Sequence, residues 1–210
     1  MLIYDFKNIL IKDFKNVFIH PLVPHPHNFG SFYFFNNLGI NKLSFIFFNN
    51  LSTGSLMLKN LNSHLNAELL HVLSSMGHGD ELILSDCNFP SDSVAAHTVS
   101  GKLIRMDGLN IPEVAEAILS VLPLDSFVQE PVLRMEVVGN PEEWVECHLE
   151  MKEVVDKTSD REWEIGSIER HAFYDRARNA YAVVCAGGER RGYGCFVLIK
   201  GVIDEQGNVV

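Results

Sequence analysis

From residue 57 to its end, the chain alternates short apolar runs with stretches whose apolar residues recur at helical spacing. Five runs have the length and composition of strands: residues 81–86, 103–106, 133–138, 181–185 and 196–199. Three stretches have helical spacing: residues 65–76, 112–122 and 142–155. Buried strands that alternate with helices form a sheet with helices packed against it. The sequence therefore predicts a single compact α/β domain with a mostly parallel, buried sheet flanked by helices.

Local signals mark where these helices begin and end. Asn66 is a predicted N-cap, and Leu65 can pack on Leu70 across the first turn. Gly77 is predicted to end this helix, and Pro112 to open the second.

The first 56 residues differ in composition from the rest. They hold ten of the fourteen phenylalanines, carry a net charge of +2, and show no sustained helical or strand period. Residues 52–55 then resemble a linker. The sequence predicts that residues 1–56 are an extension that is disordered or foreign to the native protein. The native chain would then start at Met57, and residues 57–210 would form the domain. A targeting extension is the alternative, although the segment lacks the arginines of a mitochondrial transit peptide.

Charge and hydropathy restrict the partners. The whole chain has a net charge of −10, so residues 57–210 carry −12, and a phosphate backbone would repel them. A neutral small molecule is compatible with this charge. Apolar stretches such as the near-continuous run 43–48 are far shorter than the roughly 18 residues that span a membrane. The sequence predicts no nucleic-acid partner and no membrane partner.

The four cysteines, Cys87, Cys147, Cys185 and Cys195, form no CxxC pair and no zinc-type cluster with histidine. We interpret them as free thiols of a cytoplasmic protein and expect no metal site. His97 and His148 also lack partners at metal spacing and are interpreted as structural.

Two side chains beside the first predicted strand could carry chemistry. His78 lies between Gly77 and Gly79, just before the strand, and histidine transfers protons readily at neutral pH. Asp86 follows the strand, at the end where open α/β sheets bind ligands, and could accept hydrogen bonds from hydroxyl groups. The alternatives are an ordinary loop histidine after a capping glycine and an aspartate that begins a turn.

Two later stretches are further candidates. In the stretch 168–177, Arg170 and His171 could face a ligand, whereas Asp175, Arg176 and Arg178 fit a solvated helix face. The glycine-rich stretch 187–195 is not a phosphate loop, because it lacks the Gly-Lys-Ser/Thr ending. It is predicted to be either a plain hairpin or the wall of a pocket that carries Tyr193.

Taken in order, these motifs resemble the ribose-pyranase/fucose-mutarotase (RbsD/FucU) family, and its fucose branch in particular. The resemblance covers about residues 57–205. It rests on Met57-Leu58-Lys59-Asn60, Glu68-Leu69-Leu70, Met76-Gly77-His78-Gly79-Asp80, Asp86 with Asn88-Phe89-Pro90, Arg105 with Asp107-Gly108, Pro123-Leu124-Asp125, Arg170 with Phe173-Tyr174-Asp175-Arg176-Ala177, and Tyr193-Gly194.

The resemblance implies an isomerase that equilibrates the anomers of free L-fucose, with no metal and no organic cofactor. It also implies a homodecamer with sites near subunit boundaries. By position, His78 matches the proton donor, and Asp86, Arg170, Tyr193 and Cys195 match substrate-binding positions. Position 195 departs from the family, which usually has asparagine there.

Mutarotation requires only that the anomeric hydroxyl loses a proton and the ring oxygen gains one. We expect His78 to protonate the ring oxygen, while Asp86, Tyr193 or water takes the anomeric proton. A D-ribose pyranase and a sugar-binding protein without turnover are the two alternative functions.

Overall fold

The computed structural model describes residues 29–36, 39–46, 58–159 and 161–210. The chain divides into two units, Met1–Gly54 and Ser55–Val210. In the first, strands β1 (Phe29–Asn36) and β2 (Gly39–Ile46) pair antiparallel. Met57 lies outside the described residues. The assignment of residues 1–56 as an extension foreign to the domain stays a prediction.

The second unit is built on a six-stranded sheet with the strand order β4-β7-β3-β8-β5-β6. The strands are β3 (Glu81–Ser85), β4 (Leu103–Met106), β5 (Val132–Met135), β6 (Ile165–Ile168), β7 (Ala182–Ala186) and β8 (Phe196–Ile199). Neighbours pair parallel except at β8, which is antiparallel to β3 and to β5. The predicted α/β fold with a mostly parallel sheet is confirmed.

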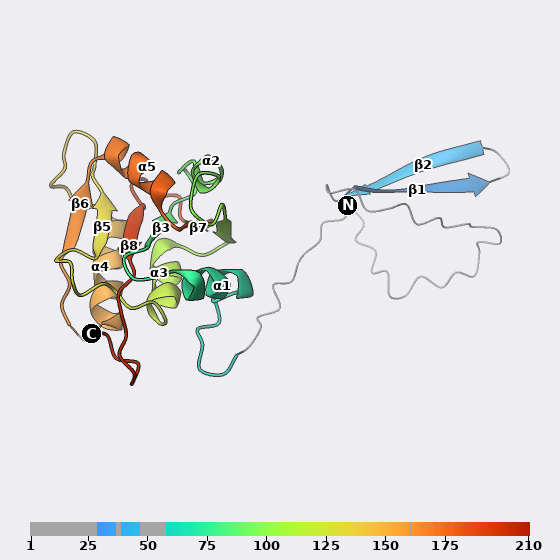
Figure 1. The fold of residues 1–210 in the computed structure, drawn as a ribbon. Helices are drawn as coiled ribbons and strands as arrows, with labels where there is room; N and C mark the ends of the chain where they lie inside the picture. The colour runs from blue at the N-terminus through green and yellow to red at the C-terminus, as the bar shows by residue number, and fades with distance from the viewer. Residues whose placement is uncertain (1–28, 37–38, 47–57, 160) are drawn as a thin grey trace. The chain divides into compact units, whose positions relative to one another are not determined.

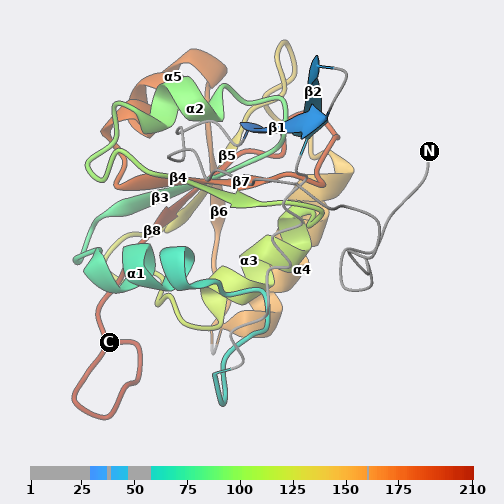
Figure 2. The same ribbon diagram turned by 90° about the vertical axis from the view of Figure 1, so that its right-hand side faces the viewer.

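Helices cover both faces of this sheet (Figures 1 and 2). They are α1 (Ala67–Ser75), α2 (Ser91–Ala95), α3 (Ile111–Leu119), α4 (Glu146–Thr158) and α5 (Arg170–Asn179). Figure 2 shows α2 and α5 over one face and α1, α3 and α4 over the other. Alternate residues of β3 follow this division. Leu82 and Leu84 join the core under α1, α3 and α4, and Ile83 joins the core under α2 and α5. Both faces are therefore apolar, as the uninterrupted hydrophobic strands predict.

The helix starts agree with the sequence signals. The Asn66 side chain accepts a hydrogen bond from the Leu69 N–H at 2.8 Å, and Asn110 and Glu113 form a capping box on α3. Gly77 does not adopt the left-handed conformation expected of a terminating glycine. That conformation occurs at Gly79, with φ +80°. Asp80 instead holds the Gly77 N–H through its carboxylate, at 2.6 Å.

Two predicted elements have clearly different boundaries in the structure. The strand predicted over 133–138 ends at Met135, and the helix predicted from Glu142 begins at Glu146. Leu149, expected on the apolar face of that helix, is exposed, because the buried face contains Cys147, His148 and Met151 instead. The short elements α2 and β6 gave no periodic signal that could predict them.

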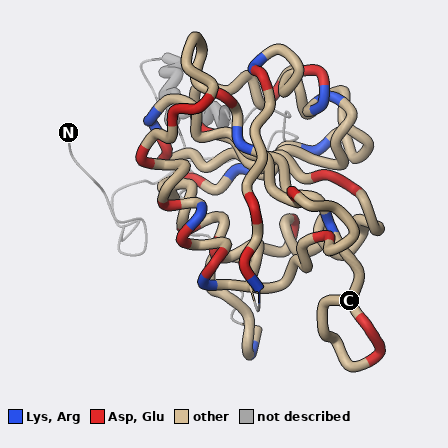
Figure 3. The backbone as a smooth tube through the Cα atoms, turned by 90° about the vertical axis from the view of Figure 1, so that its left-hand side faces the viewer, with Lys and Arg blue, Asp and Glu red and all other residues tan. Residues whose placement is uncertain are grey.

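The outer surface of α4 carries charges of both signs. Lys152 pairs with Asp156 along the helix, and Lys157 pairs with Glu116 of α3 at 2.7 Å. Figure 3 shows lysines and arginines interspersed with acidic residues over the described chain. Within that part of the chain, no helix is long and apolar enough to cross a membrane.

The topology gives the sheet two functionally distinct edges. Strands β3 to β7 run in one direction and end at what we call the carboxyl edge, while the opposite edge is the amino edge. Because β8 runs in the other direction, it starts at the carboxyl edge and ends at the amino edge. The stretch 187–195 is not a hairpin, since β3 lies between β7 and β8. It crosses over the end of β3 and brings Tyr193 and Gly194 to Asp86.

Candidate active site

Asp86 organises the carboxyl edge of the sheet. Its carboxylate is 3% exposed and accepts three backbone hydrogen bonds. Oδ1 accepts from Asn88 N at 2.8 Å and Phe89 N at 3.0 Å, and Oδ2 accepts from Gly194 N at 3.1 Å. Burial raises the pKa of Asp86, although the three N–H groups oppose that rise. Asp86 therefore begins a turn, as one interpretation of the sequence held, and also binds the loop that carries Tyr193.

The loop over Asp86 holds Tyr193 in an unusual conformation. Tyr193 has φ +65°, a region that non-glycine residues seldom occupy. Its carbonyl oxygen accepts a hydrogen bond from the buried His148 Nε2 at 2.9 Å, and its hydroxyl accepts one from Val138 N at 3.3 Å. A Cβ atom at Gly194 would lie 3.2 Å from Asp86 Cβ, a tight contact that would shift the loop and Asp86 apart by a few tenths of an ångström. The loop is therefore not a plain hairpin, and the second predicted form, the wall of a pocket that carries Tyr193, stays a prediction.

Cys195 lies in the core beneath this loop. It is 2% exposed and packs with the cluster that includes Ile83 and Val197. Burial raises the pKa of its thiol well above the usual value, and the negative charge of Asp86 adds to this effect, so the thiol is neutral. Its carbonyl oxygen accepts a hydrogen bond from Met135 N at 2.9 Å.

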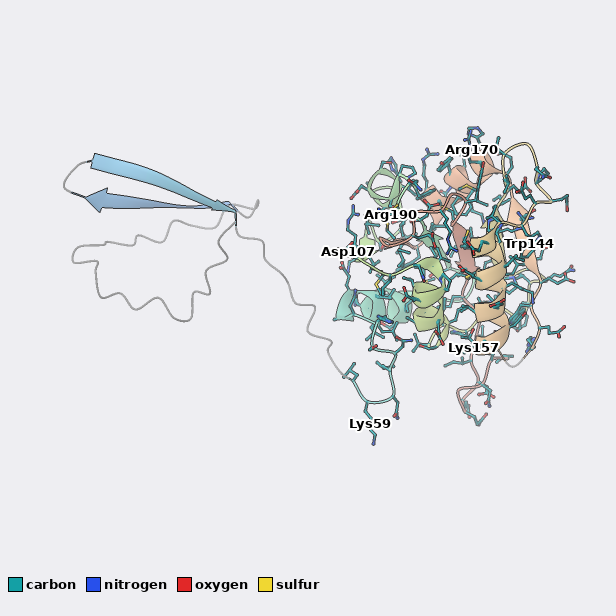
Figure 4. The ribbon with its side chains drawn as sticks, turned by 180° about the vertical axis from the view of Figure 1, so that it is seen from behind. Lys59, Asp107, Trp144, Lys157, Arg170 and Arg190 are labelled. Atoms are coloured by element: carbon teal, nitrogen blue, oxygen red, sulfur yellow. The ribbon has the colours of Figure 1, made fainter. Side chains whose placement is uncertain are left out.

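Arg170 begins α5 directly after β6, at the same edge. Glu169 caps this helix by accepting hydrogen bonds from His171 N and Ala172 N. The Arg170 side chain is half-buried, and its buried Nε–H has no partner among the described residues. Figure 4 shows Arg170 and Arg190 in the upper half of the domain, away from Lys157 at the end of α4. An unpaired buried donor of this kind can take a hydroxyl oxygen as its acceptor.

The other arginines of α5 have structural roles. Arg176 was expected on a solvated face, but it pairs with Glu81 at the start of β3, with Nη2 to Oε1 at 2.6 Å. Arg178 pairs with Asp175 on the surface, as expected of a solvated face.

His78 lies at the amino edge. Its imidazole is half-exposed, and Nε2 lies 3.2 Å from Oδ1 of Asp125, whose side chain is buried. The ring centroid of Phe127 is 5.3 Å from that of His78, with the planes tilted by 54°. Phe127 itself is 67% exposed. A half-exposed imidazole next to a buried carboxylate is suited to proton transfer to a bound molecule.

The predicted site residues therefore form two groups within one chain. Asp86, Arg170, Tyr193 and Cys195 are at the carboxyl edge, and His78 is at the amino edge. Between them lies β3, with five residues. At about 3.3 Å per residue this is a separation of roughly 16 Å. One chain does not bring His78 to the other four residues.

Two buried groups that support the carboxyl edge were not predicted as part of the site. Glu189 is 2% exposed and holds Arg191 through both of its oxygens, at 2.9 and 2.8 Å. Burial alone would raise the pKa of Glu189, but its hydrogen bonds from Arg191 keep that pKa below the usual value. His148, which was predicted to be structural, lies on the buried face of α4 and bonds from there to the Tyr193 carbonyl oxygen. Among the described residues, no group of three His, Cys, Asp or Glu side chains is arranged to hold a metal ion.

His148 makes the stability of the domain dependent on pH. Burial lowers its pKa from 6.5 to about 4, the bond to the Tyr193 carbonyl opposes this, and the charge of Arg134 adds to it. In the unfolded chain, His148 takes up a proton as the pH falls through 6.5. In the folded chain, it does so only near pH 4. Stability is therefore lost as the pH falls through that window, by about 3 kcal/mol. Urea unfolding of the native protein and of His148→Gln at pH 7, 5.5 and 4 measures this loss. If both proteins lose the same free energy of unfolding between pH 7 and pH 4, His148 is not the group responsible.

Comparison with known proteins relates this arrangement to a family. The RbsD / FucU transport protein family matches residues 59–203. A human (Homo sapiens) protein named fucose mutarotase is 41% identical over 154 residues, which cover 70% of this chain and 94% of the human protein. The L-fucose mutarotase of Actinobacillus pleuropneumoniae serotype 5b is 38% identical over 148 residues, which cover 70% and 97% of the two chains. The crystal structure of the fucose mutarotase from Streptococcus pneumoniae in complex with L-fucose matches with a TM-score of 0.62 and 36% identity. It covers 70% of this chain and all of that one.

Proposed function

Because the chain belongs to the RbsD / FucU transport protein family, we propose that it is an L-fucose mutarotase, an isomerase that interconverts the α and β anomers of the free sugar. The observation that carries this proposal is the 41% identity to human fucose mutarotase over nearly all of that protein. The similarity to the L-fucose complex from Streptococcus pneumoniae supports the same sugar. These relatives favour L-fucose over D-ribose, and an enzyme over a protein that only binds sugar.

The reaction opens and recloses a hemiacetal. The anomeric hydroxyl loses a proton, the bond between the anomeric carbon and the ring oxygen breaks, and the ring oxygen gains a proton. Rotation of the open aldehyde before closure gives the other anomer. In this proposal His78 gives the ring oxygen its proton and takes it back on closure, because it is a half-exposed imidazole supported by a carboxylate.

The carboxyl edge would bind the hydroxyl groups. A carboxylate offers about four lone pairs, and the three N–H groups on Asp86 use three of them. A sugar hydroxyl would use the remaining position in place of the Cys195 thiol, which also lies within hydrogen-bonding reach of this carboxylate. The Arg170 Nε–H supplies a donor, and Tyr193 borders the sugar. Because the Cys195 thiol is buried, we propose that position 195 contributes through its backbone and not through its side chain.

A site with all of these residues requires two copies of the chain. A monosaccharide is far smaller than the roughly 16 Å along β3 between His78 and Asp86. Contact between the amino edge of one copy and the carboxyl edge of the next would complete the site. This contact joins different surfaces, and such contacts generate a ring when the rotation between copies closes. It supports a homo-oligomer, and the number of ten copies comes from the family resemblance alone. We place this assembly in the cytoplasm, since the four cysteines are free.

Saturation-transfer NMR on L-fucose tests the function. We expect the protein to exchange the α and β anomer signals well above the rate in buffer, and to act more slowly on D-ribose at equal concentration. Exchange of L-fucose at the buffer rate would show that the chain is not a mutarotase. Faster exchange of D-ribose than of L-fucose would assign it to pyranase activity instead.

A further inference from the structure

The carboxylate of Asp125 is built into the amino edge independently of His78. Asp125 N donates to the carbonyl oxygen of Ile199 at 3.0 Å, which attaches this residue to the end of β8. Its Oδ1 accepts from Phe127 N at 3.0 Å and faces His78 Nε2 at 3.2 Å. The side chain is 5% exposed. The position of this carboxylate is therefore fixed by backbone contacts on both sides.

The loop that carries His78 is attached to the same strand end. Gly79 N donates to the carbonyl oxygen of Lys200 at 2.8 Å. The Lys200 ammonium in turn donates to the carbonyl oxygens of Leu73 and Met76, at 2.8 and 2.5 Å, which closes the end of α1 onto β8. Both members of the His78–Asp125 pair are thus held by the end of β8. Their contact is a property of the fold and not a chance meeting of surface side chains.

A carboxylate on one ring nitrogen determines what the other nitrogen can do. A neutral imidazole carries one N–H, and an acceptor-only group favours the tautomer whose N–H points at it. With Asp125 at Nε2, the proton stays on Nε2 and the lone pair is on Nδ1. Nδ1 has no hydrogen-bond partner among the described residues. Phe127 lies against the ring, and its tilted packing opposes rotation of the imidazole.

We infer that Asp125 is a positioning residue that fixes His78 in its Nε2–H tautomer, so that Nδ1 is the atom that exchanges a proton with the sugar ring oxygen. This inference rests on the proposed mutarotase function. The imidazolium donates its Nδ1 proton as the bond between the anomeric carbon and the ring oxygen breaks, and a base takes the anomeric proton. His78 then remains neutral, with its other proton still on Nε2. On closure the ring-oxygen proton returns to Nδ1.

Asp125→Asn tests the inference with little disturbance of the fold. Oδ1 faces both Phe127 N and His78 Nε2, so an asparagine that keeps its oxygen there keeps both contacts. It replaces the carboxylate with a neutral amide oxygen, which is a weaker acceptor for the Nε2–H and no longer stabilises the imidazolium. We expect kcat for L-fucose exchange to fall by about 10²-fold with KM within about twofold, because the loss concerns proton transfer and not binding. The ¹⁵N chemical shifts of His78 should show a smaller population of the Nε2–H tautomer than in the native protein. Asp125→Glu should recover part of kcat.

The matched control is Asp156→Asn, which removes a carboxylate from the exposed Lys152 pair on α4. It should leave both kcat and the His78 tautomer unchanged. Native kcat in Asp125→Asn, or a changed tautomer without loss of kcat, would overturn the inference. If the native protein shows no mutarotation, the proposed function fails. The ¹⁵N measurement still tests the Asp125 contact in that case, because it requires no turnover.

Discussion

Replacing His78 by glutamine is expected to lower kcat/KM for L-fucose anomer exchange by about 10²–10⁴-fold, the usual contribution of a positioned acid–base group. Glutamine keeps a polar end of similar reach near Asp125, so the amino edge should stay folded, but it cannot carry a proton to the ring oxygen. Saturation-transfer NMR at saturating and limiting L-fucose separates the effect on kcat from the effect on KM. We expect the loss in kcat.

His97→Gln is the matched control for this variant. His97 is also exposed, and its Nδ1 hydrogen-bonds only to the carbonyl oxygen of Ser93, at 2.8 Å. The same substitution there should leave turnover at the native rate. Turnover in His78→Gln equal to that in His97→Gln would remove His78 from the mechanism. The proposal of a mutarotase would stand, but with another proton donor.

Assemblies that mix His78→Gln chains with Arg170→Gln chains are expected to recover activity that neither variant has alone. If each site takes His78 from one copy and Arg170 from the next, random 1:1 mixing gives about a quarter of the sites both native residues. The two variants, each with its own affinity tag, can be co-expressed and purified through both tags in succession. Their L-fucose exchange should reach about a quarter of the native rate.

The baseline is the L-fucose exchange rate of assemblies that contain one variant only. For these, the same variant is co-expressed with both affinity tags and purified in the same way. Mixed assemblies that stay at that baseline would show that His78 and Arg170 serve within one chain, and the proposal of a site between copies would be wrong. An Arg170→Gln protein with native kcat and KM would instead remove Arg170 from the sugar site.

The fold class could be predicted because its signals are local. Asn66 marks a helix start through a hydrogen bond within one turn, Pro112 marks another through its fixed φ, and the buried strands are apolar along their whole length. The direction of β8 could not be predicted, since an apolar run has the same composition in parallel and antiparallel pairs. That direction depends on the loop from β7, which crosses β3 and turns back over Asp86.

The site was predicted as a set of residues but not as an arrangement. The sequence already placed His78 before the first strand of the domain and Asp86 after it, and these positions imply opposite edges. Asp125 stood only in the Pro123-Leu124-Asp125 motif of the family resemblance. Nothing linked it to His78, because their contact joins residues 47 positions apart. The role of His148 was hidden for the same reason, since its partner is a backbone carbonyl 45 positions away.

Strand β8 is so short that its register against β3 and β5 determines the geometry of both edges at once. Its four residues are preceded by the Tyr193–Cys195 turn and followed by Lys200, which anchors the His78 loop. A slip of one position would turn Phe196 toward the opposite core and displace both edges together. An insertion in the loop before β8 would alter the carboxyl edge alone. The tolerance of this protein to insertions should therefore change abruptly at residue 196.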